Sequence, residues 1–177
     1  MNITYTNRSA KLSDCEKYRY ELIREWSRSD FAPNAAKEGQ VVFCLLNPST
    51  ADAVEDDPTI RRCVGFAQGW GYSRMVVVNL FAFRATDSSE LSKCPDCVVE
   101  SNNSYILKNA KEAALFVAGW GTKGLMLNRD NSVLNMLRSN SVVVHALGKN
   151  DDGTPKHPLY LKKSTVLCLY DKKSENL

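Results

Sequence analysis

The chain has 177 residues and a formal net charge of +3, and 44% of its residues are hydrophobic and 24% charged. This composition is that of an ordinary globular protein, the charge is far below that of a dedicated nucleic-acid clamp, and no apolar run approaches the roughly 20 residues that span a bilayer. Because an apolar leader is also missing, we expect one domain over residues 1–177, located in the cytoplasm and without a membrane partner.

The first predicted strand covers residues 18–26, where polar and apolar side chains alternate. A second covers residues 41–47, a short aliphatic run that is typical of a strand buried on both faces. It ends at Asn47, because Pro48 cannot donate a hydrogen bond to the sheet. We expect these two strands to pair antiparallel, with residues 27–40 as the loop between them.

Helix-length segments separate the later apolar runs. Asp57 followed by Pro58 is typical of a helix start, since Asp caps the first turn and Pro favours the first helical position. We therefore expect Asp57 to cap a helix rather than to act as a catalytic base. Further helices are expected over residues 100–112 and 125–137, further strands near 74–80, 114–119 and 141–147, an edge strand over 166–170, and irregular structure over 87–99.

Strands that alternate with helices predict βαβ crossovers and a parallel sheet covered on both faces. The predicted fold is therefore of the α/β class, a three-layer α/β/α sandwich with a mostly parallel four-stranded central sheet. In such sheets ligands bind beyond the carboxyl ends of the strands. Asn47, Asn79 and Trp120 follow three of these ends, and the loop that contains His157 follows the fourth. We expect these four side chains to line one cleft.

Six cysteines are present, and we interpret the scattered ones as reduced because the chain shows no secretion signal. Cys94 and Cys97 form the one close pair. A zinc site needs two more ligands nearby, and a redox motif needs its pair at a helix start after a strand, so a metal or redox role is the less favoured alternative. We expect no metal and no cofactor.

Three carboxylates, those of Asp52, Asp56 and Asp57, follow the first Asn-Pro motif. Two interpretations of this acidic cluster are open. It would repel a phosphate backbone close to the cleft, or it would hold a divalent ion on oxygen ligands.

Five short motifs stand at the predicted strand ends and in the loops beside them: Leu46–Asp52, Asp57–Thr59, Asn79–Phe81, Gly119–Gly121 and His157–Tyr160. Together they resemble the bacterial and phage domain-of-unknown-function family 1643 over nearly the whole chain. Four of them, in the same order, also resemble motifs of the uracil-DNA glycosylase superfamily, where the strands end in Asn-Pro, Leu-Asn-Thr, Leu-Trp-Gly and His-Pro-Ser-Pro. This chain has Leu159-Tyr160 in place of the last Ser-Pro.

The glycosylase resemblance implies a uracil-DNA glycosylase-like fold and three functional roles. Asn47 would position the attacking water, Asn79 would read the edge of the base, and His157 would donate a hydrogen bond to the departing base. Cleavage of an N-glycosidic bond leaves an anionic base, so this donor would stabilise charge that appears only in the transition state. The residues expected to contact substrate beside Asn79 are Pro48, Ser49, Phe81, Trp120 and Tyr160.

Three functions are therefore open: a hydrolase for an altered base in DNA or in a nucleoside, a non-catalytic binder of a nucleotide or modified base, and an interaction scaffold. The expected partner is accordingly a nucleobase, a nucleoside or DNA. Each candidate residue also has a structural interpretation. Asn47 and Asn79 would cap turns, His157 would be a solvent-facing loop residue, and Trp120 would belong to the core.

Overall fold

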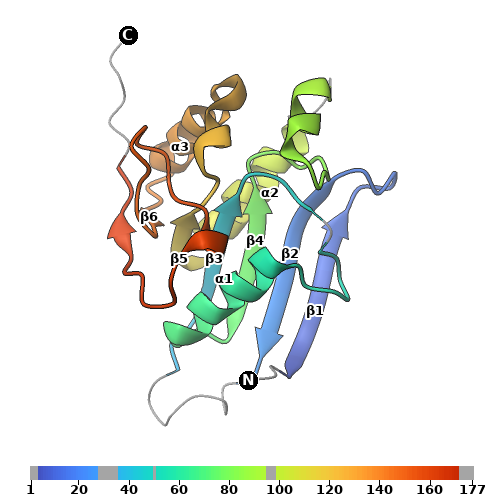
Figure 1. Cartoon of the computed structure of the whole chain (residues 1–177). Helices are drawn as coiled ribbons and strands as arrows, with labels where there is room; N and C mark the ends of the chain where they lie inside the picture. The colour runs from blue at the N-terminus through green and yellow to red at the C-terminus, as the bar shows by residue number, and fades with distance from the viewer. Residues whose placement is uncertain (1–3, 28–35, 50, 95–98, 172–177) are drawn as a thin grey trace.

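The chain folds into a mixed α/β structure around one seven-stranded sheet, seen in a computed structural model that describes residues 4–27, 36–49, 51–94 and 99–171 (Figure 1). The order of the strands across the sheet is β1-β2-β4-β3-β5-β6-β7. The strands are β1 (Tyr5–Leu12), β2 (Arg19–Trp26), β3 (Gln40–Leu45), β4 (Arg74–Asn79), β5 (Ala113–Ala118), β6 (Val144–Ala146) and β7 (Cys168–Leu169).

The four central strands, β4, β3, β5 and β6, are parallel. They correspond to the four predicted strands. The sheet nevertheless has seven strands rather than four, because β1, β2 and β7 extend it with antiparallel pairings. The expected pairing of β2 with β3 is wrong. Both edges of β3 are occupied by β4 and β5, so β2 joins the free edge of β4, where Leu22 lies opposite Val77.

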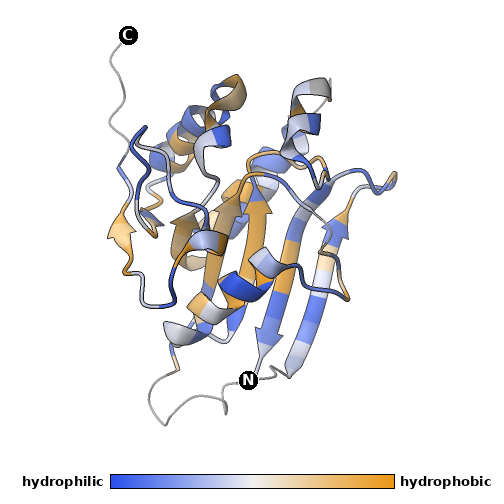
Figure 2. Ribbon diagram, in the orientation of Figure 1, coloured by the Kyte–Doolittle hydropathy of each residue, from blue (hydrophilic) through white to orange (hydrophobic). Residues whose placement is uncertain are grey.

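Helices lie on both faces of the sheet (Figure 1). On one face, Val41 and Phe43 of β3 share a hydrophobic cluster with side chains of α1, and on the other face Val42 and Cys44 share a cluster with side chains of α2 and α3. Burial on both faces explains why the central strands are continuously apolar (Figure 2). The helices are α1 (Pro58–Gly69), α2 (Glu100–Lys111) and α3 (Arg129–Ser139). None of the helices in the described residues is long and apolar enough to cross a membrane.

The predicted helix over residues 125–137 is interrupted. A short 3₁₀ segment, η3 (Thr122–Asn128), precedes α3, and Leu127 and Asn128 between them have φ values of 55° and 53°. Two consecutive residues in the left-handed region cannot continue an α-helix. Two further 3₁₀ turns, η2 (Ser88–Lys93) and η4 (Pro158–Tyr160), lie in the loops beyond the sheet, and β7 confirms the predicted edge strand.

The start of α1 confirms the predicted cap. The side-chain Oδ1 of Asp57 accepts a hydrogen bond of 2.8 Å from the backbone N–H of Ile60, and Pro58 is the first helical residue. Asn caps helices about as well as Asp, so Asp57→Asn should change the free energy of unfolding by only a few tenths of a kcal/mol, whereas Asp57→Ala should lower it by about 1 kcal/mol. Denaturant unfolding measures both changes. Loss of all turnover by a normally folded Asp57→Asn variant would instead assign this carboxylate to catalysis.

Candidate ligand-binding pocket

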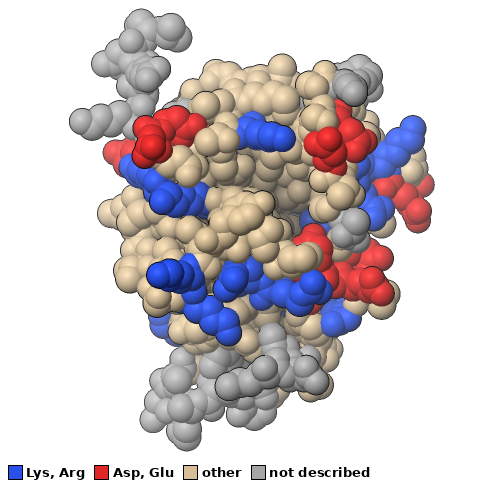
Figure 3. All heavy atoms as spheres, viewed as in Figure 1, with Lys and Arg blue, Asp and Glu red and all other residues tan. Residues whose placement is uncertain are grey.

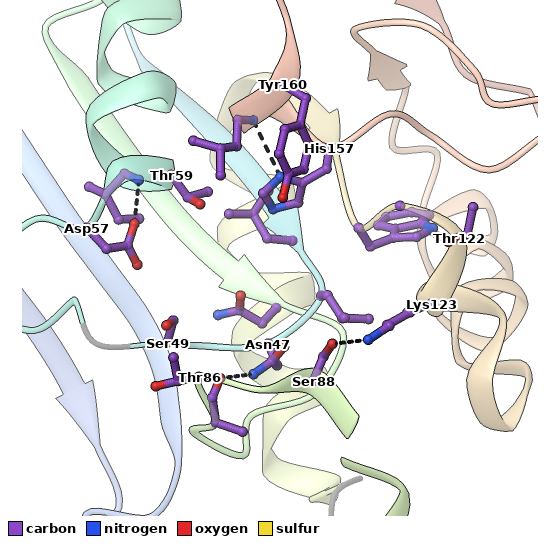
Figure 4. A pocket seen from close by; sticks show the side chains of 18 of the residues that line it. Asn47, Ser49, Asp57, Thr59, Thr86, Ser88, Thr122, Lys123, His157 and Tyr160 are labelled. Atoms are coloured by element: carbon purple, nitrogen blue, oxygen red, sulfur yellow. Dashed lines mark hydrogen bonds between the residues drawn. The ribbon is translucent and has the colours of Figure 1, made fainter. Parts of the chain in front are cut away.

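A pocket of about 430 Å³ lies beyond the carboxyl ends of β3, β4 and β5 (Figure 4). Its volume is in the range of small-molecule sites. The residues of the sequence prediction that line it are Asn47, Ser49, Asn79, Trp120, His157 and Tyr160. The polar lining residues that were not predicted include Arg19, Thr59, Thr86, Ser88, Thr122 and Lys123.

Asn79, the last residue of β4, has a side chain that is completely buried. It follows Met75 and Val77 on the face of the sheet that α1 covers. Neither its Oδ1 nor its Nδ2 has a hydrogen-bond partner in the part of the chain that the structure describes. Buried amides are nearly always bonded, since an unpaired polar group costs about 1 to 3 kcal/mol. An unpaired amide in a pocket wall is therefore suited to a ligand with both a donor and an acceptor.

The backbone that carries Asn79 is held from the opposite face of the sheet. The side-chain Nδ2 of Asn102 in α2 donates to the carbonyls of Asn79 and Leu80, at 2.9 and 3.1 Å. The Nε of Arg129 at the start of α3 donates to the carbonyl of Leu80 at 2.8 Å. Both side chains belong to residues that are at least nine-tenths buried. The direction of the Asn79 side chain is thus set by two buried donors that do not line the pocket.

Asn47 combines a structural role with an open acceptor. Its Nδ2 donates to the carbonyls of Pro48 and Ala85, at 3.0 and 2.8 Å, which uses both N–H groups and ties two loops together (Figure 4). Its Oδ1 accepts no hydrogen bond from the described residues. The side chain therefore has a structural role, although not that of a turn cap in which its oxygen accepts from backbone N–H groups, and the oxygen is left available to hold a water or a ligand donor.

His157 is placed at the pocket by a close approach of two loops. A Cβ at Gly119 would lie 2.9 Å from Cδ of Pro158, so glycine at the end of β5 is what lets the His157–Pro158 segment pack there. The Nδ1 of His157 accepts a hydrogen bond of 3.4 Å from the backbone N–H of Leu159. A neutral imidazole with Nδ1 as the acceptor carries its proton on Nε2.

Burial lowers the pKa of His157 below its ordinary value of 6.5, although the charge of Asp57 opposes this shift. The ring is thus neutral near neutral pH and offers an Nε2–H donor. As the pH falls, His157 takes up its proton at a higher pH in the unfolded chain than in the folded protein. Protonation therefore favours the unfolded chain, and this residue destabilises the fold as the pH falls from about 6.5 toward the lower pKa of the folded state. The free energy of unfolding should therefore fall more for the wild type than for His157→Gln between about pH 7 and pH 5. Equal losses would show that His157 titrates normally.

The predicted aromatic contacts divide into three cases. Tyr160 is 84% exposed at the pocket mouth, with its ring centroid 5.9 Å from that of His157, and offers a flat surface for stacking. Trp120 lines the pocket but is only 1% exposed and packs edge-on against Tyr170, as a core residue does. Phe81 is buried in the core cluster beside α2 and α3 and is not part of the pocket wall. Pro48 is also outside the wall and contributes its carbonyl to the loop contacts instead.

The carboxylates of the acidic cluster, Asp52, Asp56 and Asp57, form hydrogen bonds and an ion pair within the protein. Oδ1 of Asp52 accepts from the backbone N–H groups of Val54 and Glu55, at 2.7 and 2.8 Å. Asp56 forms a buried ion pair of 2.7 Å with Nε of Arg24. Because Asp57 caps α1, all three carboxylates have a structural role in this loop and at the helix start. Within residues 4–27, 36–49, 51–94 and 99–171, no three His, Cys, Asp or Glu side chains are placed to hold a metal ion, and Cys97 lies outside these residues.

The ion pair between Arg24 and Asp56 holds the loop onto β2, and both side chains are at most 7% exposed. Removal of one partner from a buried pair leaves an uncompensated charge. Asp56→Ala should therefore lower the free energy of unfolding by about 3 to 5 kcal/mol, measured by denaturant titration. Asp52→Ala, which removes a carboxylate from the same loop but no ion pair, should cost less, and equal losses would contradict this account.

Comparison with models of protein families gives a match that covers most of the chain. The family model described as "Protein of unknown function (DUF1643)" matches residues 19–159, from the start of β2 into η4. This range includes every residue that lines the pocket except Tyr160. Searches of the curated proteins and of the solved structures found no significant match. The chain is therefore a member of the DUF1643 family of proteins of unknown function.

Proposed function

We propose that this protein recognises a nucleobase, as part of a nucleoside, a nucleotide or DNA, and hydrolyses the N-glycosidic bond of an altered base. The observation that carries this proposal is the buried, unpaired amide of Asn79 in the pocket wall. An amide presents a donor and an acceptor side by side, which matches the adjacent carbonyl and N–H on the edge of a pyrimidine or purine. A carboxylate or a lysine lacks this combination.

The other two predicted residues fit the same reaction. As the bond between the base and the sugar breaks, its electron pair moves to the base, and the Nε2–H of His157 would stabilise the resulting anion. The Oδ1 of Asn47 would accept a hydrogen bond from the water that attacks the sugar. An amide does not take up a proton near neutral pH, so the proton of this water passes to solvent and the reaction is expected to be slow.

The proposal extends to the finer description of the fold, a three-layer α/β/α sandwich of the uracil-DNA glycosylase-like type. What supports it is the parallel order of β4, β3, β5 and β6, with the Asn47, Asn79 and His157 side chains gathered around one pocket at their carboxyl ends. We also propose that the protein acts in the cytoplasm of a bacterium or of a phage-infected cell.

A second candidate function is non-catalytic binding of a nucleotide or modified base. The observation in its favour is that Asp57 is the one carboxylate in the pocket wall among the described residues, and its Oδ1 is bonded to the start of α1. The pocket thus has an oriented acceptor for water, while its carboxylate is engaged with a helix start, which does not favour a role for it as a general base.

An abasic-site assay separates the two candidates. Single-stranded and duplex DNA that carry uracil and other altered bases, together with the corresponding nucleosides, are tested for base release and for a shift of the thermal midpoint. Base release supports hydrolysis, and a thermal shift without base release supports binding alone. If neither occurs with any of these compounds, base recognition is wrong.

A further inference from the structure

Arg19 is a buried arginine that forms no ion pair with the residues that the structure describes. It begins β2, lines the pocket and is 2% exposed. Its Nη1 donates to the carbonyl of Ala51 at 2.5 Å, but its Nε is buried without a partner among the described residues. Burial lowers the pKa of Arg19 to about 10, although the charges of Asp57 and Asp52 oppose this shift, and the guanidinium still carries its charge near neutral pH.

Arg24, five residues later on the same strand, shows how a buried arginine is normally neutralised. Its Nε pairs with Asp56 at 2.7 Å, and its other nitrogens donate to the carbonyls of Ile23 and Asp52. Arg24 does not line the pocket. An unpaired buried charge is costly, and proteins retain it where it meets a charge of opposite sign. Both arginines donate to the same loop, but Arg24 also forms an ion pair, whereas Arg19 forms none with the described residues.

The rest of the pocket wall contributes one charged side chain of each sign, Lys123 and Asp57. Lys123 is the second cation, and its Nζ donates to Oγ of Ser88 at 2.5 Å (Figure 4). Asp57 contributes a carboxylate that is engaged with the first turn of α1. That turn presents the positive end of a helix dipole, and Thr59 and Ile60 within it line the pocket. Figure 3 shows Lys and Arg side chains in a row across the face that carries α1.

We propose that the ligand of this pocket carries a phosphate and that Arg19 binds it, so that the substrate is a nucleotide unit rather than a neutral nucleoside. This inference rests on the proposed function for the identity of the base, but the phosphate contact stands on Arg19 alone. A guanidinium offers several N–H donors in one plane and matches the geometry of phosphate oxygens. A phosphate monoester of a free nucleotide and a phosphodiester of DNA share this chemistry.

The test compares Arg19→Gln with Arg24→Gln, since both variants remove one buried positive charge and one anchor of the same loop. Thermal shifts and calorimetry are recorded with inorganic phosphate, with nucleosides and their 5′-monophosphates in matched pairs, and with a short single-stranded oligonucleotide. The wild type should bind each monophosphate at least about tenfold more tightly than its nucleoside. Arg19→Gln should bind the monophosphate and the nucleoside with similar affinity. It should remain folded, because it removes an unpaired charge. Arg24→Gln should be less stable but should still bind the monophosphate more tightly than the nucleoside.

Arg19→Lys serves as a second variant and should keep part of the preference for the monophosphate. Binding of the oligonucleotide but not of the monophosphates, with dependence on Arg19, would support the inference and assign the phosphate to a DNA backbone. Binding of inorganic phosphate and of every monophosphate through Arg19 with the same affinity, whatever the base, would support it while refuting base recognition. Equal affinity for nucleoside and monophosphate, unchanged in Arg19→Gln, would overturn the inference and leave base recognition intact.

Discussion

Replacement of Asn79 by Leu is expected to raise the free energy of unfolding by about 1 to 3 kcal/mol and to abolish binding of the base. Leucine has nearly the shape of asparagine, so the pocket wall should keep its packing. The substitution removes two buried polar atoms that have no partner in the described chain, and with them the donor and acceptor that would read the base. Denaturant unfolding and ligand titration of the same variant measure the two opposite effects.

Asn102→Leu is the matched control. The amide of Asn102 is equally buried and its Oδ1 also has no partner among the described residues, but its Nδ2 donates to two backbone carbonyls. The same substitution there should lower the free energy of unfolding by about 1 to 3 kcal/mol, since both carbonyls lose a donor. If Asn79→Leu destabilises the fold as Asn102→Leu does, the Asn79 amide has a structural role, and the central observation behind base recognition is lost.

Substitution of His157 should separate turnover from binding. Asparagine places a polar atom near the position of Nδ1 and can still accept from Leu159, whereas glutamine reaches the position of Nε2. His157→Asn should therefore reduce turnover by about 100- to 1000-fold, the usual effect of losing one donor to a developing anion, with little change in affinity. His157→Gln should retain more of the activity. Rates at saturating substrate and dissociation constants are the measurements, and equal losses in the two variants would rule out Nε2 as the donor.

The parts of the fold that the sequence predicted are those set by local rules. β3 and β4 are buried on both faces and so appear as unbroken apolar runs, and the Asp57-Pro58 cap depends only on neighbouring residues. β1 was not predicted, because most of its side chains are polar or half-exposed and give no apolar pattern. The partner of β2 was predicted wrongly because strand order depends on which edges of the sheet are already occupied, which is a property of the whole fold.

The residues of the candidate site likewise include some that the sequence predicted and some that it did not. Asn47, Asn79 and His157 could be found because they stand at strand ends or in a loop beyond one. Arg19 was missed because a charged residue at the start of a strand is usually on the surface. Its signal is that β2 contains two arginines, and in the structure both take buried positions, where a charge is rare unless it is paired. Lys123 was missed because the break before α3, which brings η3 to the pocket, depends on backbone conformation rather than on an apolar pattern.

The outermost strand β1 has a consequence for the behaviour of the chain in solution. Without it, the backbone N–H and C=O groups of β2 along that edge would lack partners and would be open to pairing with another molecule. β1 itself carries exposed Asn7, Arg8 and Lys11, and its pairing with β2 is irregular near both ends. Charged side chains and bulges of this kind discourage edge-to-edge aggregation. β1 lies before the segment that matches the family, so this protection against self-association is separate from the pocket.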